Sequence, residues 1–291
     1  MIFYKLAEIG FCFETPGFVA ESENYGKFRV DSEIFADTDE KYTFTFGGTV
    51  NKLPEFQKKV FECSDYSVYQ CENGYARVLS RFDKQSYNCI CTQSPYEPRG
   101  EIIFTANGAQ AQRTSAELFR MTDLFSALLY YDAFILHGSV AQLDGKAYVF
   151  SGDSGVGKST QAELWRIVHG AAVLNGDRVI IRKIKGEWRA FGLPMCGSSR
   201  ICEAFDLPLE AITFLSQGRK NEASVPALFH KVIQIMAQAS ISMGKKEDSE
   251  KLLTLAEDIG KNIKILKYTC TADDEAAVFL KNYLNDYEKY S

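Results

Sequence analysis

One short stretch of the sequence has the composition of a phosphate-binding site. Residues 152–159 read Gly-Asp-Ser-Gly-Val-Gly-Lys-Ser and match the pattern G-x-x-x-x-G-K-[ST]. Glycines let the backbone curl so that consecutive N–H groups point at one anion. In such a loop Lys158 would reach the β- and γ-phosphates of a nucleotide, and the Ser159 hydroxyl would bind Mg²⁺. The predicted nucleotide contacts are Gly152, Asp153, Ser154, Gly155, Val156, Gly157, Lys158, Ser159 and Thr160.

The strand that enters this loop should belong to a hairpin. Residues 134–141 and 146–151 are apolar runs, and Asp144-Gly145 lies in the turn between them. Asp-Gly between two such runs strongly indicates a tight turn, so the two strands should pair antiparallel. The parallel βαβ arrangement of most nucleotide-binding sheets is not expected here. After the loop, a short helix over 160–168 should end at Gly170.

A carboxylate follows the next predicted strand. Residues 171–177 form a short strand that begins with apolar residues and ends in Asp177. At this spacing after the phosphate loop, the carboxylate should lie near the Mg²⁺ held by Ser159. Arg178 is the best candidate for contacting phosphate or an acidic substrate. His137 lies on the first strand of the hairpin, which should place it beside the loop. The catalytic candidates are His137, Lys158, Asp177 and Arg178, and the metal candidates are Ser159 and Asp177.

The order of these motifs resembles the catalytic domain of HPr kinase/phosphorylase. The resemblance covers roughly residues 130–220 and rests on His137-Gly138, the phosphate loop and the run Asn175-Gly176-Asp177-Arg178. It implies a core topology shared with ATP-dependent phosphoenolpyruvate carboxykinase, with Mg-ATP as cofactor and a serine hydroxyl as phosphate acceptor. Related kinases also carry a Gly-x-Pro…Gly segment near the nucleotide, which makes residues 192–200 a candidate substrate loop.

This sequence departs from the family at Gly176, which stands where the first of two aspartates is expected. Phosphoryl transfer depends mainly on positioning and charge neutralisation, so it tolerates such a loss. Asp177 would then serve both the metal and the hydroxyl, or His137 or Asp153 would help as base. The loss also counts against phosphorolysis. Two alternatives stay open. The first is an enzyme that acts on a small metabolite, either a kinase of free serine or an enzyme with a carboxykinase-like reaction. The second is a nucleotide-binding sensor or assembly protein without turnover.

The N-terminal part of the chain carries strand patterns and no catalytic constellation. Aromatic residues alternate at 42–46, and further strand-like runs reach residue 106. We expect residues 1–110 to form an antiparallel β-rich scaffold or substrate-recognition module with its aromatics in the core. Thr114 and Glu117 form a capping box that should start one helix carrying Leu118, Met121, Phe125 and Leu128.

Residues 111–291 should form the kinase domain with a mixed sheet, so that the whole chain is α/β with α+β character. Beyond the site, the periodicity predicts a strand at 209–215, helices at 224–239 and 247–263, a strand at 264–270 and a closing helix at 271–287. The first of these helices would have Pro226 in its first turn. His169 and His230 fall in helical stretches and are expected to be structural.

Composition restricts the class of protein. The chain has 291 residues, of which 46% are apolar, and a net charge of −5, which counts against a nucleic-acid binder. No apolar run reaches the roughly 18 residues of a membrane helix, and the start lacks a signal-peptide pattern. We therefore expect a cytoplasmic protein with buried thiols at its eight cysteines. Its expected partners are ATP and a serine-bearing peptide, small protein or small metabolite, without nucleic acid or membrane and with homo-oligomerisation left open.

Overall fold

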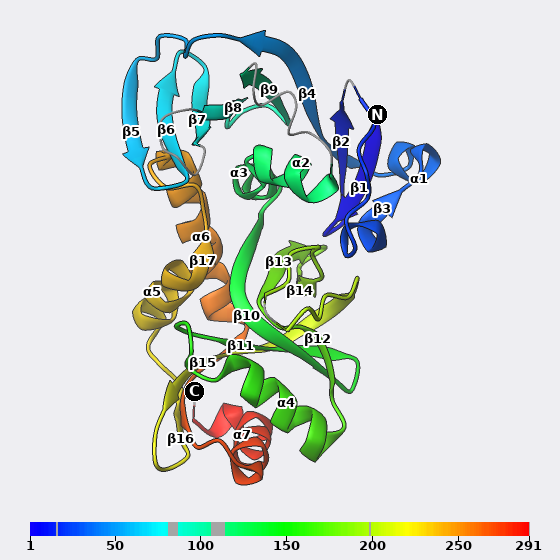
Figure 1. Ribbon diagram of the computed structural model, residues 1–291. Helices are drawn as coiled ribbons and strands as arrows, with labels where there is room; N and C mark the ends of the chain where they lie inside the picture. The colour runs from blue at the N-terminus through cyan, green and yellow to red at the C-terminus, as the bar shows by residue number, and fades with distance from the viewer. Residues whose placement is uncertain (16, 81–86, 106–113, 198, 291) are drawn as a thin grey trace. The chain divides into compact units, whose positions relative to one another are not determined.

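The computed structural model describes residues 1–290 except 16, 81–86, 106–113 and 198. The chain divides into two compact units, Met1–Tyr131 with Ile241–Glu250 and Asp132–Ser240 with Lys251–Ser291. Each unit contains its own sheet, and the fold is mixed α/β, as predicted (Figure 1). The predicted division between residues 110 and 111 lies outside the described residues. The return of Ile241–Glu250 to the first unit was not expected from the sequence.

The first unit is built on a nine-stranded sheet in the order β3-β1-β2-β4-β9-β8-β7-β6-β5. Most neighbours are antiparallel, as predicted for this module, but β2 with β4 and β4 with β9 pair in parallel, which corrects that prediction in part. Parallel neighbours need a crossover, and the short α1 lies in the first of these connections while four strands lie in the second. The strands and short helices are β1 (Ile2–Leu6), β2 (Ile9–Glu14), η1 (Tyr25–Phe28), β3 (Arg29–Val30), α1 (Ser32–Ala36), β4 (Glu40–Val50), β5 (Lys58–Glu62), β6 (Tyr66–Cys71), β7 (Gly74–Ser80), β8 (Tyr87–Gln93) and β9 (Arg99–Thr105).

The aromatic alternation of the first unit forms its core, as expected. Phe13 and Phe44 are fully buried, and their rings stack with centroids 5.4 Å apart. Phe119, which is also buried, packs against Phe13 at 5.0 Å. Because one face of each strand supplies alternate residues, the period-2 pattern predicts this core correctly.

The helix predicted to start at Thr114 is two helices, α2 (Ser115–Met121) and α3 (Leu124–Tyr130). The capping box of Thr114 and Glu117 is confirmed. The prediction of one continuous helix is wrong because Thr122 is extended and Asp123 starts a new helix by accepting a bond from the Ser126 N–H. The Asp123 side chain is fully buried and bound to residues more than a hundred positions away. Local periodicity does not contain that tertiary contact.

The second unit also contains a nine-stranded sheet, with β11-β10-β13-β14-β15-β18-β16 as its main order and with β12 and β17 pairing to β10. The predicted hairpin is confirmed: β10 and β11 are antiparallel, and both Asp144 (φ 52°) and Gly145 (φ 73°) adopt the left-handed conformation of a tight turn. On its other side β11 pairs in parallel with β15, so the sheet is mixed, as predicted. Its strands are β10 (Ala133–Leu143), β11 (Lys146–Ser151), β12 (Ala172–Asn175), β13 (Arg178–Ile184), β14 (Glu187–Phe191), β15 (Asp206–Gln217), β16 (Glu222–Ser224), β17 (Ala239–Ser240) and β18 (Lys264–Cys270).

Helices cover this sheet. Trp165 of α4 is fully buried, 4.8 Å from the ring of Tyr148 on β11, and Gly170 (φ 70°) ends the helix, as predicted. The predicted helix at 224–239 starts later, because Ser224 pairs with β18 as part of β16 and Pro226 precedes the first turn. The helices are α4 (Lys158–His169), α5 (Leu228–Gln238), α6 (Lys246–Asn262), α7 (Asp274–Asn285) and η2 (Tyr287–Lys289).

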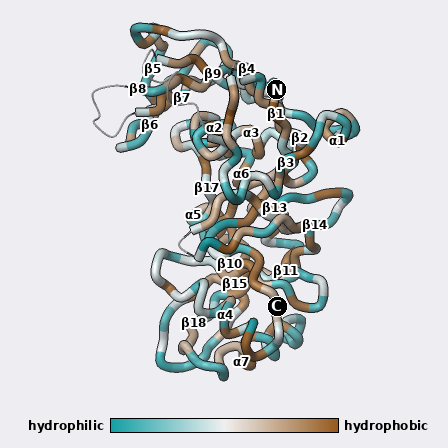
Figure 2. Tube along the Cα trace, turned by 45° about the vertical axis from the view of Figure 1, so that its right-hand side comes forward, coloured by the Kyte–Doolittle hydropathy of each residue, from teal (hydrophilic) through white to brown (hydrophobic). Residues whose placement is uncertain are grey.

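Hydropathy follows this architecture. Figure 2 shows hydrophobic residues along the strands near β10 and β15, where nearly every side chain of β10 from Ala133 to Ala141 is buried. In the described part of the chain, no helix combines the length and the apolar character needed to cross a membrane.

Candidate active site

The predicted phosphate loop connects β11 to α4, and its glycines have the conformations that the loop requires. Gly152, Gly155 and Gly157 have φ values of 137°, 79° and 108°, a region that residues with a β-carbon rarely adopt. Gly152 also has little room, since a β-carbon there would lie 3.2 Å from the Leu215 carbonyl oxygen. The local sequence therefore determines a tight curl at the end of a buried strand.

The first turn of α4 presents backbone donors without a side-chain cap. Its N-cap residue is Gly157, which has no side chain to bind these donors, and the first turn contains no acidic residue. The unpaired N–H groups and the positive end of the helix dipole make such a terminus suitable for an anion. The loop thus has the backbone geometry of a phosphate site.

Lys158 is the buried cation of this loop. Its side chain is 8% exposed, and its ammonium donates to the carbonyl oxygens of Gly152 (2.9 Å) and Asp153 (2.8 Å). Burial lowers the pKa of Lys158, while the charges of Asp177 and Asp153 act in the opposite direction. Among the described residues, no carboxylate lies within ion-pair distance of this ammonium. The positive charge is therefore held in place by backbone carbonyls, without a direct ion pair to any described carboxylate.

Asp177 is positioned by a local turn at the end of β12. The Asn175 Oδ1 accepts from the N–H groups of Asp177 (2.9 Å) and Arg178 (3.1 Å), which is an Asx-turn arrangement. The Asp177 carbonyl accepts from the Gly138 N–H at 2.8 Å, and His137 pairs with Arg178 across β10 and β13. These backbone contacts bring three of the four predicted catalytic residues together.

The side chains of His137 and Arg178 each contact one oxygen of the Asp177 carboxylate. His137 Nδ1 lies 3.5 Å from Asp177 Oδ1, and Arg178 Nε lies 3.3 Å from Asp177 Oδ2. Burial and the nearby charge of Lys158 lower the pKa of His137, against the opposing effect of Asp177. His137 is therefore neutral near pH 7 and able to accept a proton.

Ser139 joins the loop to this turn and was missed in the sequence. It is fully buried, its hydroxyl donates to the Gly176 carbonyl at 3.0 Å, and it lies 3.5 Å from the hydroxyl of Ser159. The available signal was a hydroxyl two residues after His137 in an apolar strand, which places both side chains on one face. Through Ser139, the predicted metal-binding hydroxyl of Ser159 is connected to the turn that carries Asp177.

The donor set fits a magnesium ion that arrives with a nucleotide. Mg²⁺ is commonly bound through one or two protein oxygens together with phosphates and water, and Ser159 and Asp177 supply one hydroxyl and one carboxylate. Within the described residues, no group of three His, Cys, Asp or Glu side chains could hold a metal ion.

The predicted substrate loop lies directly over the turn. The Glu203 N–H donates to the Leu174 carbonyl at 2.9 Å, and the Asn175 side chain donates to the Met195 carbonyl at 3.4 Å. A β-carbon on Gly197 would lie 3.0 Å from the β-carbon of Asp177. The predicted loop at 192–200 is therefore held against the turn that carries Asp177, with Glu203 bonded just after it, and position 198 is outside the described residues.

Asp153, the other candidate base, is turned to a different partner. Its carboxylate accepts from the side-chain amide of Gln238, at the end of α5, at 3.0 Å. Its hydrogen bond with Lys158 is made by its backbone carbonyl. Of the three candidate bases, His137 and Asp177 thus contact each other, whereas the Asp153 carboxylate contacts Gln238.

The remaining histidine and cysteine predictions concern structure. His169 contacts the Ala277 carbonyl through Nε2 at 3.1 Å and packs against Trp165, which fits the structural role expected for it. All eight cysteines are free, but the prediction of buried thiols is wrong for Cys63, which is exposed, and for Cys71 and Cys196, which are half-buried. Burial raises the pKa of Cys89 and Cys91 to about 12, so these two thiols stay protonated and unreactive near neutral pH.

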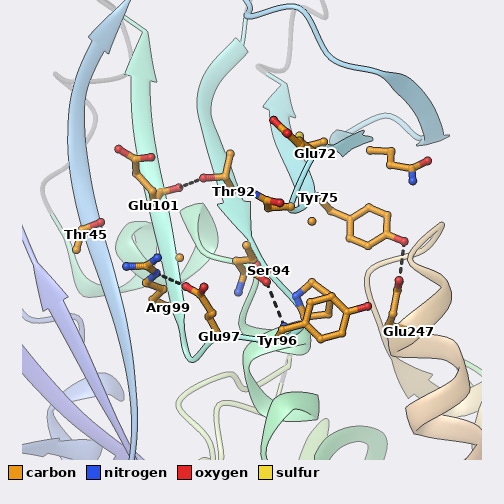
Figure 3. Close-up of a pocket in the computed structure, with 17 residues that line it drawn as sticks. Thr45, Glu72, Tyr75, Thr92, Ser94, Tyr96, Glu97, Arg99, Glu101 and Glu247 are labelled. Carbon is orange, nitrogen blue, oxygen red and sulfur yellow. Dashed lines mark hydrogen bonds and ion pairs between the residues drawn. The ribbon is translucent and has the colours of Figure 1, made fainter.

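The first unit contains a separate hollow of about 890 Å³ (Figure 3). Within it, the Tyr75 hydroxyl donates to Glu247 at 2.6 Å, and Arg99 pairs with Glu97 at 2.5 Å. Glu247 belongs to the segment that returns to this unit. Polar side chains line much of the wall. They include the hydroxyl of Thr45, the tyrosines Tyr75 and Tyr96, and the acidic residues Glu72, Glu97, Glu101 and Glu247.

Comparisons with known proteins place no family name on this chain. No protein-family profile matches it, and no curated protein matches it. Among solved structures, it is similar to the HPr(Ser) kinase/phosphatase from Coxiella burnetii at 8% sequence identity and a TM-score of 0.31, over 53% of this chain and 90% of that one. The likeness is weak in both measures and by itself assigns no family.

Proposed function

We propose that this protein is a Mg-ATP-dependent kinase that transfers the γ-phosphate to a serine hydroxyl of a small protein or peptide. The observation that carries the proposal is the buried Lys158, which ends a glycine-rich curl and has no carboxylate partner among the described residues. A buried, unneutralised cation is costly unless an anion binds beside it. Phosphate is the anion that this loop geometry suits.

The residues of the loop have separate roles in this proposal. The N–H groups of residues 155–160 bind the phosphates, and Lys158 leaves its backbone carbonyls to contact the β- and γ-phosphates. Magnesium, when bound, neutralises charge on the transferring group, with Ser159 and Asp177 as its protein ligands. Arg178 holds a planar cation at the same edge, partly exposed and able to contact phosphate.

The acceptor hydroxyl must lose a proton as it attacks. His137 is neutral near pH 7 and lies 3.5 Å from Asp177, so the pair can accept this proton and share the resulting charge. Gly176 supplies no second carboxylate. The reaction therefore depends on positioning and charge neutralisation more than on a strong base.

The first unit supports a peptide or small protein as acceptor. Its hollow of about 890 Å³ has the size of a site for several side chains and lies in a unit without the nucleotide loop. A small metabolite would have no need of such an additional recognition surface. Acceptor choice is thus assigned to the first unit and phosphate transfer to the second.

Labelled Mg-ATP tests the proposal when offered with candidate peptides and, separately, with free serine. We expect phosphate to appear on a peptide serine, and Lys158→Ala to lower transfer about 10²-fold or more. Lys261→Ala, a change of an exposed lysine in α6, is the matched control and should leave transfer unchanged. Unchanged transfer in Lys158→Ala would refute the proposal, and transfer to free serine alone would favour the metabolite kinase.

A nucleotide-binding sensor is the second candidate, and Gly176 favours it. Without a carboxylate at this position, the site would bind ATP and turn it over slowly or not at all. Lys158-dependent ATP binding in calorimetry, with no ADP formed in the presence of any acceptor, would select this function.

A further inference from the structure

A serine from the substrate loop fills the space beside Gly176. A β-carbon built on Gly176 would overlap the Ser199 hydroxyl oxygen and lie 2.8 Å from the Ser199 β-carbon. Any side chain at position 176 would therefore displace Ser199. The place next to Asp177 where the resembled kinases carry a carboxylate holds a serine hydroxyl in this chain.

The segment around Ser199 is anchored on both sides of that contact. Before it, Gly197 packs against Asp177, and the Arg200 N–H donates to the Gly197 carbonyl at 3.1 Å to close a tight turn. After it, Glu203 is bound to the backbone of β12. These bonds hold the Ser199 side chain against the turn.

The hydroxyl itself is accessible. Ser199 is exposed, and its oxygen accepts one long bond of 3.4 Å from the Ile201 N–H. Its own proton is given to none of the described residues. A hydroxyl in this state is free to act as a nucleophile once a base accepts that proton.

Short contacts connect this hydroxyl to the phosphate loop. The carbonyl of Gly176, the residue that Ser199 touches, accepts from Ser139, and Ser139 lies 3.5 Å from Ser159. Ser159 is the residue expected to hold the metal beside the γ-phosphate. Ser199 thus lies against the turn that carries Asp177, on the acceptor side of the proposed site.

We propose that Ser199 is an internal phosphate acceptor, which the protein phosphorylates in cis from ATP bound at its own loop. This inference rests on the proposed kinase function. In the step, a bond forms between Ser199 Oγ and the γ-phosphorus, and the bond from that phosphorus to the β–γ bridging oxygen breaks. ADP leaves with the bonding electrons, and the hydroxyl proton passes to the His137–Asp177 pair and then to solvent.

The product would regulate the site. Phosphoserine carries about −1.5 to −2 charges at neutral pH, and at this position it would stand beside Asp177. Repulsion should weaken the binding of a second Mg-ATP, while Arg178 offers the charge that stabilises the product. We therefore expect the modification to stop near one phosphate per chain and to slow transfer to other acceptors.

Incubation of the full chain with labelled Mg-ATP and no other acceptor tests the inference. We expect up to one phosphate per chain, mapped to Ser199 by mass spectrometry, with a first-order rate that does not change over a tenfold range of protein concentration. Ser199→Ala should abolish labelling and still bind ATP. Ser224→Ala, a change of another exposed serine of the second unit, should label like the wild type.

Three results would overturn the inference. A measurement of ATP binding by the wild type distinguishes them from a failure of the proposed kinase function. Labelling elsewhere than Ser199, or a rate proportional to protein concentration, would exclude self-phosphorylation in cis at this residue. Lys158-dependent ATP binding and transfer to a peptide, with Ser199 unmodified, would exclude the inference and leave the kinase function standing. If the wild type bound no Mg-ATP, both would fail.

Gly176→Ala offers a test that does not remove the hydroxyl. The added methyl group overlaps Ser199 and should shift it from Asp177, so we expect self-labelling to fall at least tenfold. ATP binding should stay within about twofold of the wild type, which a melting curve with and without Mg-ATP would check. Undiminished labelling in this variant would show that the contact with residue 176 does not position the acceptor.

Discussion

Two buried lysines, one in each unit, have opposite environments. Lys245 of the first unit is 3% exposed and bonded to the Asp123 carboxylate at 2.7 Å and the Ser126 hydroxyl at 2.9 Å. Lys158 of the second unit is 8% exposed, and among the described residues its ammonium is bonded to two backbone carbonyls and to no side chain. Both lysines are buried cations, but only one has its charge neutralised within the protein.

This difference separates structure from function. The buried carboxylate of Asp123 also accepts from Ser242 at 2.6 Å, so the whole group is satisfied and has nothing left to bind. Lys158 has backbone partners that a phosphate can replace. A buried lysine with a matched charge holds elements together, whereas one with carbonyls alone is poised for an anion.

The largest effect is expected from Lys245→Met. It leaves the fully buried Asp123 without its ion pair, and breaking such a pair from one side costs about 3–5 kcal/mol of unfolding free energy. Chemical denaturation measures this loss. A double change, Asp123→Asn with Lys245→Met, removes both charges and should recover a large part of it. A loss below about 1 kcal/mol in the single variant would show that the ion pair is not a structural element.

Protonation of Asp123 in acid should weaken the same ion pair without mutation, with a smaller loss of stability. Burial alone would raise the pKa of Asp123, but the charges of Lys245 and Arg77 outweigh it and hold the pKa at about 2. Because the folded pKa is lower than that of the unfolded chain, the contribution is complete above about pH 4 and is lost as pH falls toward 2. Its size is about 2 kcal/mol, measured by denaturation at several pH values. The Asp123→Asn variant should lose this part of the acid dependence.

A smaller change is expected from Lys158→Met. Removal of an unneutralised buried charge should change the unfolding free energy by no more than about 1 kcal/mol, in the stabilising direction. Thermal melting with and without Mg-ATP checks both sides of the comparison, because only the wild type should be stabilised by the nucleotide. A loss of unfolding free energy as large as that expected for Lys245→Met would show that Lys158 stabilises the fold in the same way as Lys245.

The smallest effect concerns His137. Its pKa is lowered, through burial first and the Lys158 charge second, so near pH 6 the unfolded chain binds a proton that the folded chain does not. Stability should therefore fall slightly as pH decreases through the ordinary value of about 6.5. His137→Asn should remove this slope, and Lys158→Met should reduce it. Denaturation midpoints between pH 5.5 and 7.5 measure the difference, and an unchanged slope in His137→Asn would assign it to other groups.

Local features were predicted best. The turn at Asp144-Gly145, the glycine stop of α4, the capping box at Thr114 and the strand at 264–270 were all read from short patterns. Each depends on conformations and hydrogen bonds within a few residues, which the sequence contains directly. The roles of the site residues stay predictions, although their side chains lie together as the motif order suggested.

The predictions were wrong where contacts between residues far apart in the sequence determine the structure. The break between α2 and α3 depends on Asp123, whose partner Lys245 is 122 positions away. The parallel pairing of β4 with β9 depends on four strands inserted between them. Periodicity cannot show such contacts, because they depend on which elements meet after folding.

Gly176 shows the division most clearly. The sequence by itself determined that a carboxylate is missing beside Asp177 and that a glycine-rich loop with Lys158 precedes it. Only the tertiary structure shows which side chain fills the space beside Gly176. Ser199 lies there because its loop is held by a backbone hydrogen bond to β12. Local backbone conformation depends on each residue and its sequence neighbours, but the contacts of a side chain depend on the packing of the whole unit.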